Sequence, residues 1–258
     1  MGKRNGYQPG TFCWSELSTT DQDAAKAFYS GLFGWEVSDR PVGDGEVYSM
    51  MLLDGLQVAA IASQPRQQRE AGVPALWNSY VAVEDADALT ERAKGLGANV
   101  HAPPFDVLKA GRMAVLQDPQ GAFLMLWQPH EHKGAQLVNA PSALVWNELQ
   151  SPDLDASAAF YTDLFGWDVH DAPETQEGYK LIKNGDAQNG GMRELTPGSP
   201  PNWLVYFAVE DIDAGLARVE ELGGSALMGP IDIDIARIAV VQDPQGAVFA
   251  LYAGQLDP

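Results

Sequence analysis

The sequence predicts an α+β protein of two tandem domains, each composed of two β-α-β-β-β modules. The first observation behind this prediction is a long internal repeat in the 258-residue chain. Two 24-residue segments, WSELSTTDQDAAKAFYSGLFGWEV from Trp14 and WNELQSPDLDASAAFYTDLFGWDV from Trp146, are identical at 14 positions. The second observation is that short β-rich runs and amphipathic helical runs follow the same order in both copies.

A second repeated pair shows how far the duplication extends. RMAVLQDPQGA from Arg112 and RIAVVQDPQGA from Arg237 match at 9 of 11 positions. The copies stay 125 to 132 residues apart, which indicates a duplicated domain. A polar segment with a proline near each end separates them. We therefore expect a first domain over residues 1–128, a linker over residues 129–142 and a second domain over residues 143–258.

The repeated phrase itself predicts a strand followed by a helix. Residues 11–19 alternate and are rich in β-forming side chains, which is typical of a strand. Asp21 or Asp23 can cap the next helix, whose apolar positions recur at helical spacing until Gly34 ends it. We expect the aromatic residues of FYSGLFGW and FYTDLFGW to hold each helix against its sheet.

The remaining segments of the first domain predict further strands and a second helix. They are strands at residues 47–53, 56–63 and 80–83, a helix within residues 84–98, and a hairpin over residues 111–127. Asp54-Gly55 suits a tight turn between two of these strands, and DPQG suits the turn of the hairpin. The second domain repeats this pattern.

Composition and charge limit the possible partners. The net charge of -19 would repel a phosphate backbone, so we expect no nucleic-acid partner. No run approaches 18 apolar residues, so we expect no membrane span. Cys13 is the single cysteine and cannot form an internal disulfide, which fits a reducing cytoplasm. We expect a cytoplasmic monomer or homodimer that takes a small-molecule ligand.

The motifs D-x6-FY-x2-LFGW, AVED and DPQG, in this order and twice over, resemble the glyoxalase, bleomycin-resistance and extradiol dioxygenase superfamily. The resemblance covers nearly the whole chain. In detail the chain looks like a tandem two-domain, actinobacterial branch of glyoxalase-like proteins that also carry the label hydroxylase. It implies the vicinal oxygen chelate fold, in which paired β-α-β-β-β modules curl into a half-open barrel around a ligand, often with a divalent metal ion.

The family's metal-ligand positions carry unsuitable side chains in this sequence. By count along the motifs, they fall at Trp14, Asn78 and Met125 in the first domain and at Trp146, Leu204 and Ala250 in the second. An indole offers only an N–H donor, and a catalytic metal needs at least three nitrogen, oxygen or sulfur ligands. Glu194 lies near a fourth position but stands alone. We therefore expect no metal and no other cofactor.

Strand alternation places a different set of side chains in each cavity. In the first domain the candidate ligand-binding residues are Trp14, Glu16, Asn78, Tyr80, Arg112 and Met125. In the second domain they are Trp146, Glu148, Leu204, Tyr206, Arg237 and Ala250. Aromatic walls with one acid suit a flat aromatic ligand. We expect the second cavity to be the roomier because its last strand carries smaller side chains.

Several interpretations of the two glutamates remain open. Glu16 and Glu148 could pair with Arg112 and Arg237, contact a ligand, or act as a general base. Three functions follow: a protein that binds a planar aromatic compound, a metal-independent or accessory enzyme acting on an aromatic metabolite, or a lyase with unusual metal ligands. The third is the least consistent with the ligand positions.

Overall fold

The computed structural model of the chain describes residues 2–43, 45–172, 178–233 and 235–256. The first domain contains β1 (Phe12–Thr19), α1 (Gln22–Phe33), β2 (Glu36–Gly43), β3 (Glu46–Leu53), β4 (Leu56–Ser63), α2 (Arg66–Glu70), β5 (Leu76–Ala82), α3 (Ala86–Gly95), β6 (Asn99–Val107), β7 (Gly111–Gln117) and β8 (Phe123–Pro129). The second domain contains β9 (Leu144–Ser151), α4 (Leu154–Phe165), β10 (Asp168–Asp171), β11 (Tyr179–Asn184), β12 (Ala187–Glu194), β13 (Asn202–Ala208), α5 (Ile212–Glu221), β14 (Ser225–Ile233), β15 (Ala236–Gln242) and β16 (Val248–Gly254).

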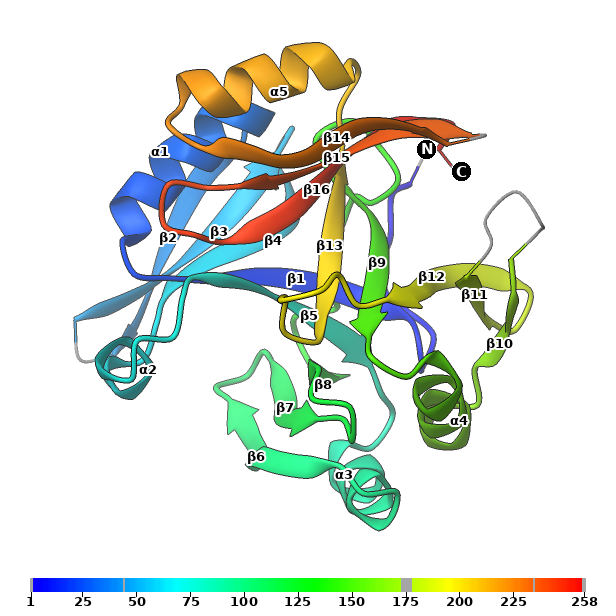
Figure 1. The fold of residues 1–258 in the computed structure, drawn as a ribbon. Helices are drawn as coiled ribbons and strands as arrows, with labels where there is room; N and C mark the ends of the chain where they lie inside the picture. Colours follow the sequence, from blue (N-terminus) through cyan, green and yellow to red (C-terminus); the bar gives the residue numbers. More distant parts are fainter. Residues whose placement is uncertain (1, 44, 173–177, 234, 257–258) are drawn as a thin grey trace.

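Each domain forms one eight-stranded sheet (Figure 1). The strand order is β2-β3-β4-β1-β5-β8-β7-β6 in the first domain and β10-β11-β12-β9-β13-β16-β15-β14 in the second. The two modules of a domain meet at an antiparallel pair, β1 with β5 and β9 with β13. The outer strands of each sheet do not pair with each other, so the sheets curl without closing into barrels. The predicted fold class is confirmed.

The local signals in the repeated phrase act as predicted. Asp21 caps α1 by accepting a hydrogen bond from the Ala24 backbone N–H at 3.0 Å, and Asp153 caps α4 in the same way. Gly34 ends α1 with a φ of 72°, in the left-handed region where glycine avoids a Cβ clash. The turn between β3 and β4 has φ values of 51° at Asp54 and 75° at Gly55, as an Asp-Gly hairpin turn requires.

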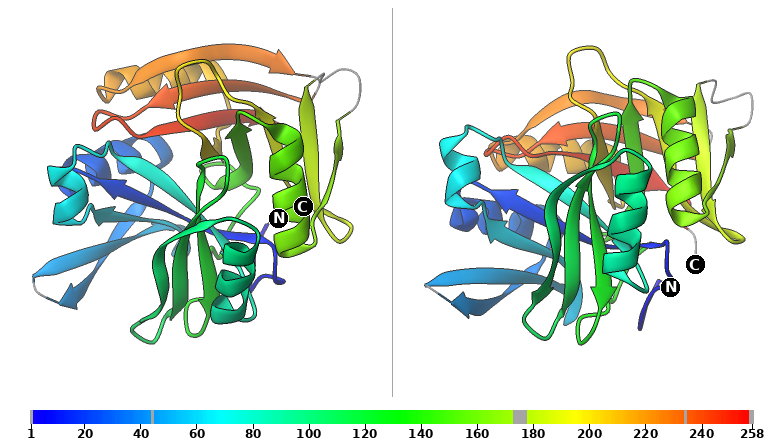
Figure 2. Two further views of the ribbon diagram at one scale, coloured as in Figure 1. Left: turned by 60° about the horizontal axis from the view of Figure 1, so that its bottom comes forward. Right: turned by 90° about the horizontal axis from the view of Figure 1, so that it is seen from below.

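The aromatic residues of the repeat do more than predicted, because they also hold the two domains together. Phe33 of α1 packs on Phe207 of β13 with ring centroids 5.2 Å apart, and Phe28 packs on Phe249 of β16 at 6.4 Å. α4 makes the reciprocal contact with the first domain, where Tyr161 lies in one apolar cluster with β5 and β8. Figures 1 and 2 show the result: α1 lies beside α5, and α3 lies beside α4.

Two reciprocal hydrogen bonds cross the same domain interface. The Tyr161 hydroxyl donates to Asp118 Oδ2 at 2.8 Å, and the Tyr29 hydroxyl donates to Asp243 Oδ2 at 3.0 Å. Both aspartates are 3% exposed and begin a DPQG turn. Trp203 Nε1 donates to the Tyr161 hydroxyl at 2.9 Å, which extends the network into β13. Each hairpin turn is thus anchored by a tyrosine of the other domain.

The structure also locates two histidines and the single cysteine of the chain. His101 lies in strand β6 and His170 in strand β10. Cys13 is a free, buried cysteine. None of the helices in the described part of the chain has the length and apolar character needed to span a membrane.

Candidate ligand-binding sites

The central strands of each sheet bring most of the predicted cavity residues together. In the first domain Trp14 lies opposite Tyr80, Tyr80 lies beside Met125, and Glu16 lies opposite Asn78. The second domain repeats this register. There, Trp146 lies opposite Tyr206, Tyr206 beside Ala250, and Glu148 opposite Leu204. The cavity residues that were predicted from strand alternation are therefore neighbours on one face of each sheet.

Each site also contains a tyrosine that the sequence did not indicate. Trp14 Nε1 donates to the Tyr48 hydroxyl at 3.2 Å, and Trp146 Nε1 donates to the Tyr179 hydroxyl at 2.9 Å. Tyr48 lies near the start of β3, shortly after a Gly-Glu pair, and Tyr179 is the first residue of β11, directly after a Glu-Gly pair in the sequence. Tyr48 follows Trp14 by 34 residues, whereas Tyr179 follows Trp146 by 33 residues. A comparison of the two copies at a fixed offset therefore does not align the two tyrosines.

Glu148 is a buried carboxylate with an unused hydrogen-bonding atom. It is 4% exposed, and its Oε1 has no hydrogen-bond partner among the described residues. Burial raises the pKa of this carboxyl group, while the Arg193 charge and the hydroxyl groups of Tyr206 and Tyr179 partly oppose that shift. A buried polar atom without a partner is energetically costly and uncommon in folded proteins.

The predicted pairing of these glutamates with arginines is wrong. Arg112 Nε lies 2.6 Å from Asp87 Oδ2 of α3, and its Nη1 lies 3.1 Å from Asp106. Arg237 likewise pairs with Asp213 of α5 at 2.7 Å. Because Asp87 belongs to α3, this ion pair places the Arg112 side chain on the helix-covered face of its sheet. The two arginines therefore tie helices to sheets and do not face the cavities.

The second domain has an open cavity of about 900 Å³ over this constellation. Its aromatic and charged wall residues are Trp146, Glu148, Tyr179, Arg193, Glu194, Tyr206 and Tyr252. Ile235 and Leu256 contribute apolar surface to the same cavity. Leu204 and Ala250 belong to the same buried apolar cluster as Tyr206. A cavity of this size is typical of small-molecule sites.

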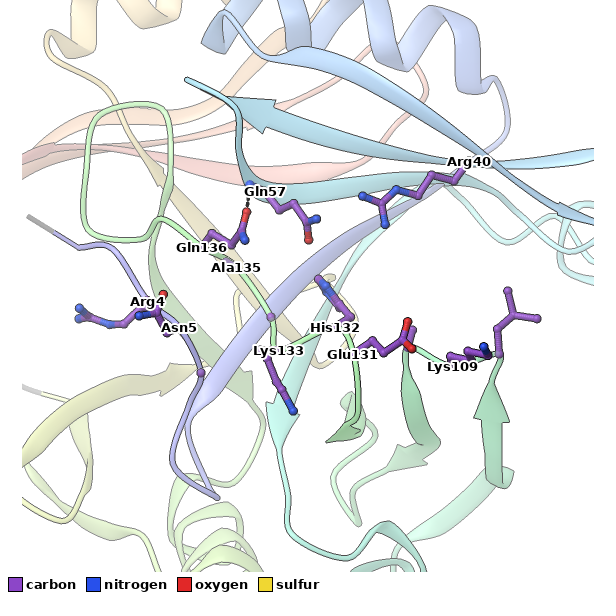
Figure 3. Close-up of a pocket in the computed structure, with 14 residues that line it drawn as sticks. Arg4, Asn5, Arg40, Gln57, Lys109, Glu131, His132, Lys133, Ala135 and Gln136 are labelled. Atoms are coloured by element: carbon purple, nitrogen blue, oxygen red, sulfur yellow. Dashed lines mark hydrogen bonds between the residues drawn. The ribbon is translucent and has the colours of Figure 1, made fainter.

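In the first domain the linker covers the corresponding residues. The His132 ring packs edge-on against Trp14 at 4.5 Å between centroids and also contacts Trp127 at 5.8 Å. The polar composition of residues 129–142 is typical of solvated side chains, but the His132 ring is packed against the first sheet. The cavity next to the linker, shown in Figure 3, has none of Trp14, Glu16 or Tyr80 in its walls.

The buried imidazole ring of His132 should make the stability of the protein sensitive to acid. Burial, followed by the charge of Arg40, lowers the pKa of His132 to about 4 from the ordinary 6.5. The unfolded chain therefore binds this proton more readily, and stability should fall as the pH decreases from about 6.5 to about 4. Over that window His132→Gln should remove a loss on the order of 3 kcal/mol.

Denaturant unfolding at several pH values measures this effect. The exposed His130 on the same linker provides the control, because His130→Gln should leave the profile unchanged. Parallel pH profiles for the wild type and His132→Gln would contradict a buried neutral ring.

A close approach at Gly191 distinguishes the second cavity from the first. A Cβ atom at Gly191 would lie 2.0 Å from the Tyr179 hydroxyl oxygen. The corresponding position of the first domain is Ala60, which lies beside Glu16 as Gly191 lies beside Glu148. Glycine therefore lets the tyrosine ring lie close to β12.

Substituting Gly191 by alanine should displace the Tyr179 side chain and break its hydrogen bond with Trp146. We expect the affinity for the cavity's ligand to fall about tenfold, since a loss of about 1.4 kcal/mol corresponds to that factor. Thermal unfolding should change little because the displaced group is the end of a side chain. Titration of the wild type and of Gly191→Ala with the same ligand measures the change. Equal affinities would contradict a role in ligand binding for the close contact between Gly191 and Tyr179.

The side chains at the family's metal positions do not fit a divalent ion. Trp14 and Met125 occupy two of them in the first domain, and Trp146, Leu204 and Ala250 occupy the three in the second. In the part of the chain that the structure describes, no three His, Cys, Asp or Glu side chains cluster as a metal site would require. In the second-domain cavity the possible oxygen ligands are Glu148, Glu194 and the neighbouring tyrosine hydroxyls.

Comparisons with known proteins agree with this architecture. The sequence model described as "Glyoxalase/Bleomycin resistance protein/Dioxygenase superfamily" matches residues 12–126 and 143–251. The chain is 46% identical over 256 residues to "Putative glyoxylase CFP32" of Mycobacterium tuberculosis, covering 97% of both chains. It is 36% identical over 260 residues to "Anthracycline biosynthesis protein DnrV" of Streptomyces peucetius, covering 95% of this chain and 94% of that protein.

Two solved structures share the fold at low sequence identity. The Mn(II)-bound glyoxalase from Novosphingobium aromaticivorans superimposes with a TM-score of 0.67 at 17% identity, covering 99% of this chain and 84% of that one. The 2,3-dioxygenase LapB from Pseudomonas sp. KL28 gives a TM-score of 0.66 at 13% identity, covering 98% of this chain and 96% of that one. At these identities the likeness concerns the fold alone.

Proposed function

The chain belongs to the Glyoxalase/Bleomycin resistance protein/Dioxygenase superfamily, and from this premise we propose that it binds a small planar aromatic molecule in the cavity of its second domain. The observation that carries the proposal is Glu148 Oε1, a buried acceptor in the cavity wall without a hydrogen-bond partner in the described residues. A ligand hydroxyl or amine would supply the missing donor and offset the cost of burying the carboxylate.

The other walls of the cavity define the rest of the ligand. Trp146 and Tyr252 are only partly buried, so their rings can pack against a flat ring system. Arg193 forms no ion pair within 4.0 Å in the described part of the chain. Its guanidinium can donate to a carbonyl, phenolate or carboxylate oxygen of the ligand. These features together suit a hydroxylated aromatic ketone or quinone.

The relatives support a polycyclic ligand without establishing one. Two Streptomyces proteins that match over 95% of this chain are named anthracycline biosynthesis proteins. An anthracycline contains fused aromatic and quinone rings with phenolic hydroxyl groups, which is the chemistry that the cavity would recognise. In the proposed complex Glu148, Arg193 and the aromatic side chains would contact the ligand directly.

Arg193→Met tests the proposal directly. A hydroxyanthraquinone should quench tryptophan fluorescence of the wild-type protein saturably. The variant should bind it about tenfold more weakly, because a charge-assisted hydrogen bond is lost. Arg66→Met, which alters an exposed arginine outside the cavity, is the matched control and should bind like the wild type. Equal affinities for wild type and Arg193→Met would contradict the proposed site.

One observation favours catalysis as a second candidate function. Burial raises the pKa of Glu148, which makes its carboxylate a stronger base toward a bound hydroxyl group. Such an enzyme would shift a proton within an aromatic or enolisable metabolite. Incubation with candidate compounds, followed by mass and absorbance measurements, separates the two functions. Ligand recovered unchanged supports binding alone, whereas turnover that Glu148→Gln abolishes supports catalysis.

A further inference from the structure

The mouth of the first domain concentrates positive charge on an otherwise acidic molecule. A cavity of about 810 Å³ lies between the linker, β2, β4 and the turn joining β6 to β7. Its walls include four of the 16 Lys and Arg residues, namely Arg4, Arg40, Lys109 and Lys133, but only one Asp or Glu, Glu131. A chain with a net charge of -19 would rarely place its cations in this way by chance.

Three of the four cations of this pocket are available to a ligand. Arg40, Lys109 and Lys133 form no ion pair within 4.0 Å in the described part of the chain. Figure 3 shows the Arg40 side chain extending over the gap toward Gln57 and above His132, whereas Lys133 points away from it. Arg40 lies directly opposite Tyr48 on the neighbouring strand, so its position along β2 is fixed by the sheet.

His132 contributes a second, independent observation. Its Nε2 is buried and has no hydrogen-bond partner among the described residues, although the ring lines the pocket. Packing against Trp14 and Trp127 fixes the ring plane. A ring nitrogen held in place beside an arginine can donate its N–H to an anionic oxygen.

Hydrogen bonds join the backbone segments around the pocket to one another. The N–H of His132 donates to the Ala110 carbonyl at 3.0 Å, which joins the linker to the β6–β7 turn. The N–H of Gln136 donates to the Gln57 carbonyl at 2.7 Å, and the Gln136 side chain accepts from the Gln57 N–H at 2.9 Å. The walls therefore need little rearrangement to bind a ligand, which lowers the entropic cost of binding.

We propose that this pocket is a second ligand site, which binds a small organic anion through the guanidinium of Arg40 and the Nε2–H of His132. The anionic group is a phosphate or a carboxylate, with Lys109 completing the positive field. The volume of about 810 Å³ leaves room for an organic body, which would lie near Leu108, a side chain that is 74% exposed. This site is separate from the second-domain cavity and does not depend on its proposed function.

Histidine-detected NMR of the full chain tests the proposal. Phenyl phosphate and benzoate, titrated at constant ionic strength, should shift the His132 ring resonances saturably, and the tighter probe identifies the preferred anionic group. Arg40→Gln should raise the Kd at least about tenfold. Arg66→Gln, which changes the net charge equally at an exposed position outside the pocket, should alter it less than about twofold.

The opposite results would overturn the anion site. No saturable shift of His132 with either probe would exclude binding at this pocket. Equal weakening by Arg40→Gln and Arg66→Gln would show that only the net charge attracts the probe. A Glu148→Gln protein should bind both probes like the wild type, so failure here is distinguishable from failure of the second-domain cavity.

Discussion

Replacing Glu148 by glutamine should weaken binding of the aromatic ligand by about 10- to 100-fold, because a hydrogen bond to a charged acceptor contributes about 1.5–3 kcal/mol. The same change should stabilise the free protein by about 1–2 kcal/mol at a pH where Glu148 is ionised, because it then removes a buried charge that lacks a full set of partners. Opposite effects on affinity and stability are typical of a residue retained for binding.

The stability gain has a defined pH dependence. Burial raises the pKa of Glu148 in the folded state above its unfolded value, so the folded protein holds this proton more tightly. Ionisation of Glu148 therefore costs stability as the pH rises from the unfolded pKa through the folded pKa. The advantage of Glu148→Gln should vanish at low pH and grow as the pH rises through this window. Denaturant unfolding at several pH values measures it.

Glu16 provides the matched control in the first domain. Burial also raises its pKa, and Tyr48 and Tyr80 partly oppose the shift, but the linker covers its neighbour Trp14. Glu16→Gln should therefore leave the ligand affinity unchanged. An equal loss of affinity in both variants, or a destabilised Glu148→Gln protein, would contradict the assignment of the open cavity as the site.

Tyr161→Phe should destabilise the protein by about 2–4 kcal/mol. The substitution removes the donor to the buried Asp118 Oδ2 and the acceptor of the Trp203 indole N–H, so two buried groups lose a partner. It should also raise the pKa of Asp118 further, because the Tyr161 hydrogen bond opposes the upward shift caused by burial. Thermal or denaturant unfolding measures the stability, and NMR of the Asp118 carboxyl group measures the pKa.

Two variants show whether the domain interface causes this loss. Tyr29→Phe removes the equivalent bond to Asp243 and should cost a similar amount. Tyr7→Phe removes a hydroxyl that donates to the uncharged Ala135 carbonyl at 2.7 Å, and it should cost only about 1 kcal/mol. If Tyr161→Phe costs no more than Tyr7→Phe, the tyrosine–aspartate bonds do not hold the domains together.

The sequence predicted those features that depend on periodicity and repetition. The match between the segments at Trp14 and Trp146 indicated duplicated domains, and capping rules located Asp21 and Gly34 at the ends of α1. Period-two alternation correctly grouped Trp14 and Tyr80 on neighbouring strands. Such signals are local, or recur at a fixed offset, and can therefore be recognised without knowledge of tertiary contacts.

The remaining site features depend on contacts that no periodic pattern encodes. Arg112 lies on the opposite face from Glu16 because its strand positions it against Asp87 of α3. His132 packs on Trp14 because the linker turns back over the first sheet, although its composition resembles that of a solvated segment. Arg193 lies beside Gln150 in the second sheet, and the equivalent position of the first sheet, beside Ser18, is Ala62. The repeat therefore contains no second copy of this arginine.

The indole N–H resonances of Trp146 and Trp14 offer the most direct test of the central claim that the second domain holds the ligand site. Trp146 Nε1 donates to the Tyr179 hydroxyl within the open cavity, and Trp14 Nε1 donates to Tyr48 beneath the linker. Titration with a hydroxyanthraquinone should shift the Trp146 indole resonance saturably and leave that of Trp14 in place. A saturable shift of Trp14 alone, or no saturable shift of either, would contradict the claim.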